Sequence, residues 1–131
     1  MTYYGNSRYA EFDELVGEKV LSVSIEKSDY GEHEIIFKTS PKTFAMFHDQ
    51  GCCEQVEIKE IDNDISKLIG ATIVEAEVVT EASETDEGSM TWTFYKITTD
   101  KADRFTISWL GESNGYYSEE VTFAEIFPEE E

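Results

Sequence analysis

The chain has 131 residues, enough for one domain with one hydrophobic core, to which eight phenylalanines, seven tyrosines and two tryptophans can contribute. Its formal net charge of -19, from 29 acidic and 10 basic residues, argues against direct binding of a nucleic-acid backbone, which requires clustered lysine and arginine. No apolar run reaches transmembrane length, and the first residues lack the pattern of a signal peptide. We therefore expect a cytoplasmic protein, without membrane contact, whose thiols stay reduced.

The first half of the chain predicts one short helix followed by strands. Within residues 9–16, Phe12, Leu15 and Val16 recur at helical spacing, and a glycine follows at position 17, where it commonly ends a helix. Alternating or apolar runs then predict four strands, at residues 20–26, 34–38, 43–47 and 56–61.

The second half predicts the same order of elements. Residues 62–64 provide a polar helix start, Ile65, Leu68 and Ile69 share one helical face, and a glycine follows at position 70. Strands are expected at residues 72–79, 91–97, 104–110 and 116–123, and the acidic segment 81–89 is expected to be an exposed loop. Four aromatic residues of the two middle strands are expected in the core: Trp92, Phe94, Phe105 and Trp109.

The two halves also resemble each other in sequence. Residues 15–20 (Leu-Val-Gly-Glu-Lys-Val) resemble residues 68–73 (Leu-Ile-Gly-Ala-Thr-Ile). We therefore predict an α+β fold with antiparallel β-sheets, two short helices and one shared core, in a single domain of residues 1–131. Its two pseudo-repeated halves would lie at about residues 9–61 and 62–126, followed by an acidic tail at residues 127–131.

The stretch from Phe47 to Glu54 gathers both cysteines of the chain and one of its two histidines. Imidazole and thiolate are preferred zinc ligands, and Gly51 lets the backbone turn between them. The stretch connects two predicted strands, a place where ligand groups are common. The sequence therefore predicts a structural Zn²⁺ ion with the ligands His48, Cys52, Cys53 and Glu54.

Other interpretations of this cluster stay open. The two cysteines could be ordinary thiols, one partly buried and one exposed, beside a surface histidine, or they could form a vicinal disulfide. A Cys-His nucleophile pair is a further alternative. Asp49 could supply an oxygen ligand, and His33 could be a remote ligand or a surface residue.

Four motifs together resemble one family of proteins: residues 48–54 (His-Asp-Gln-Gly-Cys-Cys-Glu), 68–70, 92–96 (Trp-Thr-Phe-Tyr-Lys) and 109–118. They are similar to a family of small acidic proteins encoded in phages and prophages of Gram-positive bacteria, and the resemblance covers residues from about 15 to 126. Some similar proteins are anti-CRISPR proteins against type II-A effectors, at least one of them zinc-containing. The resemblance implies the same role for this chain.

We accordingly expect a phage-encoded, zinc-binding protein that is not an enzyme and that inhibits a host nucleic-acid enzyme, a type II-A CRISPR effector of the Cas9 type. It would bind a basic surface of that enzyme and hinder the loading of target DNA, because such effectors hold nucleic acid in positively charged channels. Six acidic residues are the candidates for this contact: Asp29, Glu32, Glu84, Asp86, Glu87 and Glu112. Two other classes stay open, a zinc-dependent hydrolase and a sponge for a small signalling molecule.

Overall fold

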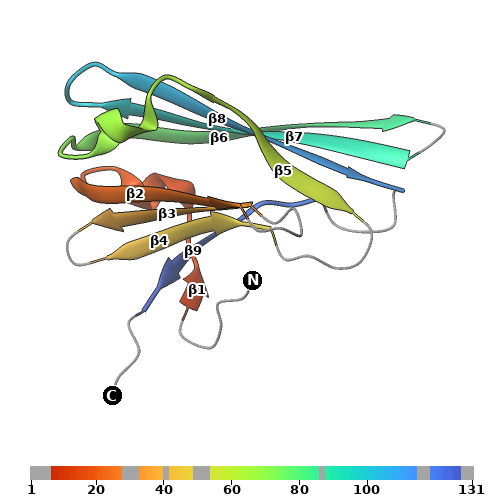
Figure 1. Cartoon of the computed structure of the whole chain (residues 1–131), viewed down its shortest axis with the longest axis horizontal. Helices are drawn as coiled ribbons and strands as arrows, with labels where there is room; N and C mark the ends of the chain where they lie inside the picture. Colours follow the sequence, from red (N-terminus) through yellow and green to blue (C-terminus); the bar gives the residue numbers. More distant parts are fainter. Residues whose placement is uncertain are drawn as a thin grey trace.

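The computed structural model describes residues 7–27, 33–39, 42–48, 54–85, 88–114 and 119–127, which form two antiparallel β-sheets in two layers (Figure 1). The five-stranded sheet has the strand order β1 (Ser7–Tyr9), β9 (Thr122–Ile126), β4 (Thr43–Phe47), β3 (His33–Thr39) and β2 (Val20–Lys27). The four-stranded sheet has the order β5 (Gln55–Asp62), β8 (Arg104–Ser113), β7 (Gly88–Thr99) and β6 (Ile73–Thr85). The core lies between the layers, as in a β-sandwich.

The predicted α+β fold is wrong, because both expected helices are single 3-10 turns. The turn η1 spans Phe12–Leu15 and η2 spans Ile65–Leu68, four residues each. Gly17 and Gly70 follow with φ angles of +90° and +86°, a left-handed conformation that ends each turn. Four residues form too few hydrogen bonds to offset the cost of helix nucleation. The apolar residues at helical spacing instead anchor a turn to the core.

Two predicted segments near the ends of strands also need correction. The acidic segment 81–89, expected to be a loop, is mostly strand, because β6 continues to Thr85 and β7 begins at Gly88. Glu84 pairs with Ser89 across this hairpin, so the ladder of backbone hydrogen bonds extends both strands beyond the apolar pattern. The last strand begins at Thr122, not at residue 116, and residues 115–118 lie outside the described part.

Side chains from both sheets and from the two 3-10 turns form the main core. Trp109 in β8 is 0% exposed, and its indole N–H donates to the sulfur of Met46 in β4, with an N···S distance of 3.0 Å across the two layers. Phe12 in η1 packs edge to face against Tyr95 and Phe123, with ring centroids 4.7 and 5.2 Å apart. The largest fully buried side chains are those of Trp109, Phe37, Phe44, Phe105, Leu15, Ile35, Met46, Leu68, Ile73, Ile97, Ile107 and Val20.

In its described residues, each half of the chain has one 3-10 turn followed by four strands, and its last strand joins the sheet built mainly by the other half. β5 pairs with β8, and β9 pairs with β4. The junctions carry equivalent hydrogen bonds: the N–H of Gly17 donates to the carbonyl of Ile73 at 2.8 Å, and that of Gly70 to the carbonyl of Val20 at 2.7 Å. Because the last strands are exchanged, neither half contains a complete sheet of its own.

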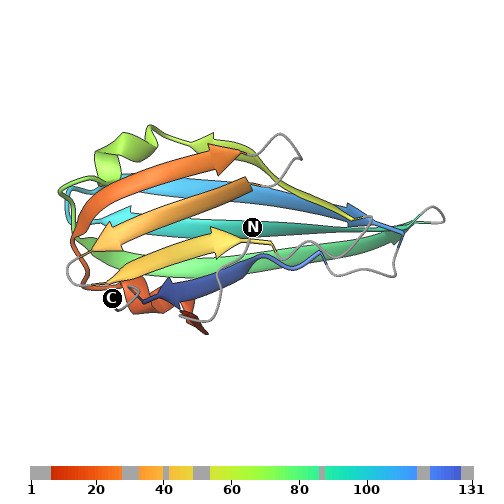
Figure 2. The ribbon, with the colours of Figure 1, turned by 60° about the horizontal axis from the view of Figure 1, so that its bottom comes forward.

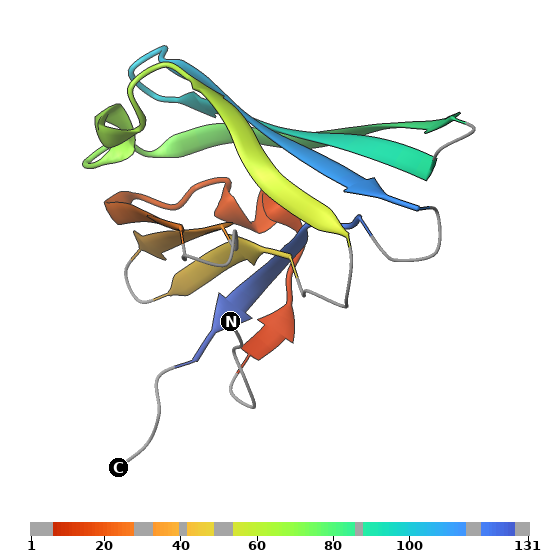
Figure 3. The same cartoon turned by 45° about the vertical axis from the view of Figure 1, so that its right-hand side comes forward.

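The four-stranded sheet is longer than the five-stranded sheet, and its β6–β7 hairpin extends beyond the other layer (Figure 2). β6 has 13 residues and β7 has 12, whereas β2 has 8. A second view shows the same hairpin reaching past the lower layer (Figure 3). Among the described residues, therefore, no strand of the other sheet lies opposite the inner face of the hairpin end. No helix in the described segments is long and apolar enough to cross a membrane.

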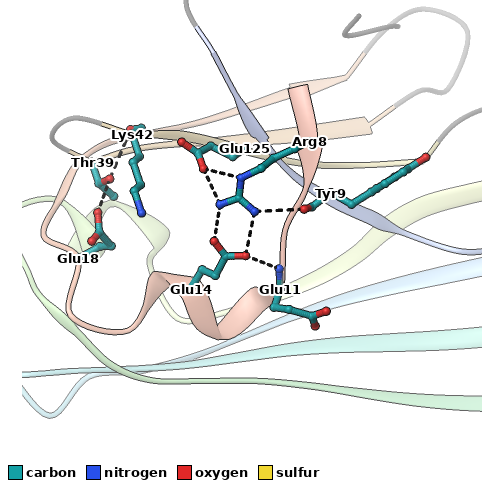
Figure 4. A network of polar contacts seen from close by, with 8 residues as sticks. All are labelled: Arg8, Tyr9, Glu11, Glu14, Glu18, Thr39, Lys42 and Glu125. Carbon is teal, nitrogen blue, oxygen red and sulfur yellow. Dashed lines mark hydrogen bonds and ion pairs between the residues drawn. The ribbon is translucent and has the colours of Figure 1, made fainter. Parts of the chain in front are cut away.

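An ion-pair network joins the beginning of the described chain to its last strand (Figure 4). The Arg8 guanidinium donates to Oε1 of Glu125 in β9 at 2.7 Å and to Oε1 of Glu14 in η1 at 2.5 Å. Glu14 also accepts from the backbone N–H of Glu11 at 2.8 Å. These hydrogen bonds, of which the one from Arg8 has the largest effect, hold the pKa of Glu14 below its usual value. The network fixes β1 and η1 against β9.

Candidate functional site

Two loops of the molecule are each closed by a buried carboxylate that bonds to the residue six positions earlier. Glu54, before β5, bonds to His48, after β4. Glu119, before β9, accepts from the hydroxyl of Ser113, the last residue of β8, at 2.5 Å. The two closures are joined, because Nδ1 of His48 lies 2.7 Å from the backbone carbonyl oxygen of Glu120. This junction is the first candidate site.

His48 and Glu54 form a buried, hydrogen-bonded pair. A carbonyl oxygen can only accept, so Nδ1 of His48 carries the proton that it donates to Glu120. The other ring nitrogen, Nε2, lies 2.8 Å from Oε2 of Glu54, and a hydrogen bond there requires a further proton on the imidazole or on the carboxyl group. The two side chains are 4% and 1% exposed. The pair is therefore a structural link that neither solvent nor a substrate can reach.

In the described geometry His48 and Glu54, two of the four predicted zinc ligands, bond directly to each other. Two ligand atoms of one tetrahedral zinc ion lie roughly 3.3 Å apart, whereas Nε2 and Oε2 are 2.8 Å apart and bond directly to each other. In the described ranges, no three histidine, cysteine or acidic side chains are grouped as a metal site would need. Cys52, Cys53 and Asp49 lie outside those ranges, so zinc binding stays a prediction.

Glu119 is held by three hydroxyl groups of the four-stranded sheet. Thr91 donates to its Oε1 at 2.8 Å, and Ser89 and Ser113 donate to its Oε2. Gly111 makes room for this segment, since a Cβ atom there would lie 2.7 Å from the Cβ of Glu119. Burial raises the pKa of Glu119, but the hydrogen bonds from the three hydroxyls outweigh burial and lower the pKa below its usual value. Glu119 therefore fastens the start of β9 to the sheet.

Glu119→Gln is expected to make the stability of the protein less dependent on pH. Because the folded-state pKa of Glu119 is lowered, its carboxylate contributes stability that is fully present above the unfolded-state pKa, near 4.5, and is lost as the pH falls through the folded-state pKa. The variant should be less stable than the wild type by roughly 1–2 kcal/mol at about pH 6, and the difference should shrink towards about pH 3.

Urea unfolding at a series of pH values measures this difference. Glu112→Gln, at an exposed position of β8, is the control for the loss of one carboxylate. If the difference in unfolding free energy between wild type and Glu119→Gln stays constant over the whole pH range, the stabilising role assigned to the Glu119 carboxylate is wrong.

An open groove of about 730 Å³ lies beside the overhanging hairpin. One wall is the inner face of β6 and β7, which includes Val78, Thr80 and Ala82, and the other is formed by residues 9–12 and 119–123. Its described lining holds no basic side chain but four carboxylates, those of Glu11, Glu84, Glu119 and Glu120. The groove therefore suits a positively charged occupant with some apolar surface.

The side of the four-stranded sheet away from the core has an aromatic centre. Directly opposite residues of paired strands point to the same face. Trp92 in β7 lies opposite Leu110 in β8, and Phe94 lies opposite Val79 in β6. The rings of Trp92 and Phe94 stack, with centroids 5.8 Å apart and an angle of 2° between the planes. The prediction that Trp92 and Phe94 lie in the core is therefore wrong, whereas Phe105 and Trp109 are buried in the core as expected.

Acidic side chains lie on both margins of this aromatic centre. On the β6 side, Glu81 lies opposite Trp92, and Glu77 lies opposite Lys96. On the β5 side, three acidic residues lie opposite outward residues of β8. We call this surface the outer face, with Val79, Trp92, Phe94 and Leu110 at the centre and Glu57, Glu60, Asp62, Glu77 and Glu81 at the margins.

The residues expected to contact a partner are only partly described. Glu84 is exposed at the end of β6, where it lines the groove, and Glu112 is exposed near the end of β8. The other four candidates, Asp29, Glu32, Asp86 and Glu87, lie outside the described residues. His33 accepts a hydrogen bond from the backbone N–H of Ile58 at 2.9 Å, which links β3 to β5.

Comparison with known proteins places the chain in a family. The model of a family described as "Domain of unknown function (DUF7448)" matches residues 13–123, a range that includes both loop closures and the outer face. No curated protein and no solved structure matches the chain. Because the matched range covers most of the 131 residues, the chain belongs to the DUF7448 family.

Proposed function

We propose that this chain is an acidic protein-binding module that docks its outer face onto a basic surface of a nucleic-acid enzyme and thereby excludes the nucleic acid. The Cas9-type effector expected from the sequence is the first partner to test. The observation that carries the proposal is the arrangement of the outer face, an aromatic centre between two acidic margins on a sheet surface directed away from the core.

The spacing of the margins supports a basic nucleic-acid channel as the partner surface. The margins lie on the two edge strands, β5 and β6, three strand steps apart. At about 4.8 Å per step, the two rows of carboxylates are roughly 14 Å apart, close to the ~12 Å width of the major groove between two phosphate backbones. A surface that binds two rows of phosphates can therefore meet these carboxylates with similar spacing.

The aromatic centre would supply most of the binding energy. Tryptophan is enriched among residues that dominate protein interfaces, particularly where a rim of other residues excludes water. Trp92 and Phe94 are partly exposed, so they can contact a partner without rearrangement of the core. The carboxylates at the margins would speed association with a basic surface and orient the complex, with screening over about 8 Å at physiological salt.

The two alternative classes have less support. A hydrolase that used His48 would need a ring nitrogen in reach of substrate, but the side chain of His48 is 4% exposed and both nitrogens have protein partners. A sponge for an anionic signalling molecule would need basic groups in its pocket, whereas the described lining of the groove is acidic.

A gel-shift assay with guide-loaded Cas9-type effector and labelled target DNA tests the proposal. Wild-type protein in excess should reduce DNA binding by about tenfold or more, and Trp92→Ser should lose most of this inhibition, since a buried aromatic contact contributes roughly 2 kcal/mol or more. Leu21→Ser, at a residue of β2 that is 52% exposed on the other sheet, should inhibit like the wild type.

Equal inhibition by wild type and Trp92→Ser would exclude the outer face as the contact surface. Undiminished DNA binding in the presence of excess wild type, for effectors from several Gram-positive hosts, would remove this kind of enzyme as the partner. A thermal melt of each variant confirms that the serine substitutions leave the fold intact.

A further inference from the structure

We infer that the free edge of β6 binds an extended, lysine- or arginine-rich segment of the partner as an added antiparallel or parallel strand. This inference rests on the proposed function, because it names the part of the partner that the sheet would hold. It joins two observations, an open strand edge and an acidic groove beside it.

β6 is the last strand of the four-stranded sheet, and none of the described strands pairs with its outer side. It spans Ile73–Thr85, and at its start both backbone groups of Ile73 are bonded, the carbonyl to the N–H of Gly17 and the N–H to the carbonyl of Glu18. Such an edge presents a row of backbone N–H and C=O groups, which an extended peptide can pair with. The hairpin also reaches beyond the five-stranded sheet, so this edge can be approached from the side (Figure 2).

The groove beside this edge gives one set of side chains of an added strand a place to bind. Val78, Thr80 and Ala82 belong to both β6 and the groove wall, and Val78 is 46% exposed. Alternate side chains of an added strand would point into the groove, since successive residues of a strand face opposite sides of the sheet. The other set would lie on the outer face beside Glu77 and Glu81.

Charge identifies the occupant as basic. Side chains in the groove would meet the carboxylates that line it, and side chains on the outer face would meet those of β6, so both sets would be near negative charge. A second copy of this chain fits badly. Antiparallel pairing of two β6 strands centred on Val79 would place Glu77 of one copy opposite Glu81 of the other, and like charges in that position are destabilising.

The test uses a fluorescein-labelled peptide of about ten residues with alternating lysine and threonine, and fluorescence anisotropy with the full chain at about 150 mM salt. Two further peptides carry N-methyl groups on alternate residues, one at odd and one at even positions, and a third is N-methylated throughout. An alternately methylated strand keeps one edge that can pair, whereas a fully methylated strand has none.

We expect the parent peptide to bind, and at least one alternately methylated peptide to bind with an affinity within about threefold of the parent's. The fully methylated peptide should bind with an affinity lower by about tenfold or more. Glu81→Lys should weaken the parent peptide about fivefold or more, while Glu60→Lys, the same charge change on the opposite margin, should change it less than about twofold. The inference would be overturned if the parent peptide did not bind, or if the fully methylated peptide bound equally well. It would also be overturned if both alternately methylated peptides lost their binding, or if the two lysine variants had equal effects.

Failure of this inference can be distinguished from failure of the proposed function. Peptide binding in this pattern without inhibition of any Cas9-type effector would leave the strand edge as a binding site and remove that partner. Inhibition that depends on Trp92, without peptide binding, would leave the outer face as the contact and remove the added strand.

Discussion

Trp109→Ala is expected to lower the free energy of unfolding by about 3–5 kcal/mol, because the substitution empties a site at the centre of the core. Trp109 is 0% exposed on the inner side of β8, and its indole N–H donates to the sulfur of Met46 in the opposite layer. Alanine removes the contacts between the two sheets and leaves a cavity that neighbouring strands cannot fill, since each is fixed by backbone pairing. Urea unfolding followed by circular dichroism measures the loss.

Trp92→Ala is the matched control for this prediction. It deletes the same side chain from the same sheet, but from the outer face, where the ring is partly exposed and stacks on Phe94. We expect a loss of no more than roughly 1–2 kcal/mol, because little apolar surface is newly exposed and no cavity forms. Equal losses for the two variants would mean that the assignment of the two faces is wrong.

The strands could be predicted from the sequence because most of them alternate between apolar and polar residues. Residues 20–26, 34–38 and 43–47 lie within β2, β3 and β4, respectively. Alternation does not state which of two apolar sets is buried. In β7 the side chains of Trp92 and Phe94 point outward, so the expectation that these large aromatic residues face the core was wrong. The pairing of β7 with β8 shows which face of β7 is buried.

The two 3-10 turns were wrongly predicted as helices, because the spacing of apolar residues alone does not distinguish a helix from a single turn. Phe12 and Leu15 are buried in η1 as a helix would require, yet the chain turns away two residues after Leu15, at Gly17. The β6–β7 hairpin was missed for the opposite reason. Its end extends beyond the described strands of the other sheet, and its sequence lacks the apolar alternation that marks a half-buried strand.

Two residues of the candidate site, His48 and Glu54, could be singled out from the sequence, but the hydrogen bond between them could not. The sequence brought His48 and Glu54 together as ligands, and the structure places them in direct contact, with the other ring nitrogen of His48 bonded to the carbonyl of Glu120. Glu119 was not singled out, although its spacing to Ser113 equals that of Glu54 to His48, six residues in each case. The internal similarity of the two halves is the signal that could have identified it.

His48→Ala is expected to lower the free energy of unfolding by about 3–5 kcal/mol, whereas Glu54→Gln should cost no more than about 1 kcal/mol. Alanine leaves a carboxyl group buried without its partner and removes the link to the carbonyl of Glu120. Glutamine keeps the bond, because its amide N–H can donate to Nε2 while Nδ1 of the neutral ring still donates to Glu120. Glu54→Leu, which fills the space but cannot donate, should resemble His48→Ala.

The contrast between Glu54→Gln and Glu54→Leu separates a hydrogen-bonded pair from a metal site. If His48 and Glu54 bond directly, the amide replaces the carboxyl group and stability tracks the presence of a donor. If both were zinc ligands, the neutral amide would bind the metal more weakly than a carboxylate, and Glu54→Gln would lose stability together with metal, because metal binding contributes to folding free energy. Elemental analysis of untagged wild type and Glu54→Gln, beside their urea unfolding curves, therefore decides the question. Zinc in the wild type at about one ion per chain, lost in a destabilised Glu54→Gln, would replace the hydrogen-bonded pair with the predicted zinc site.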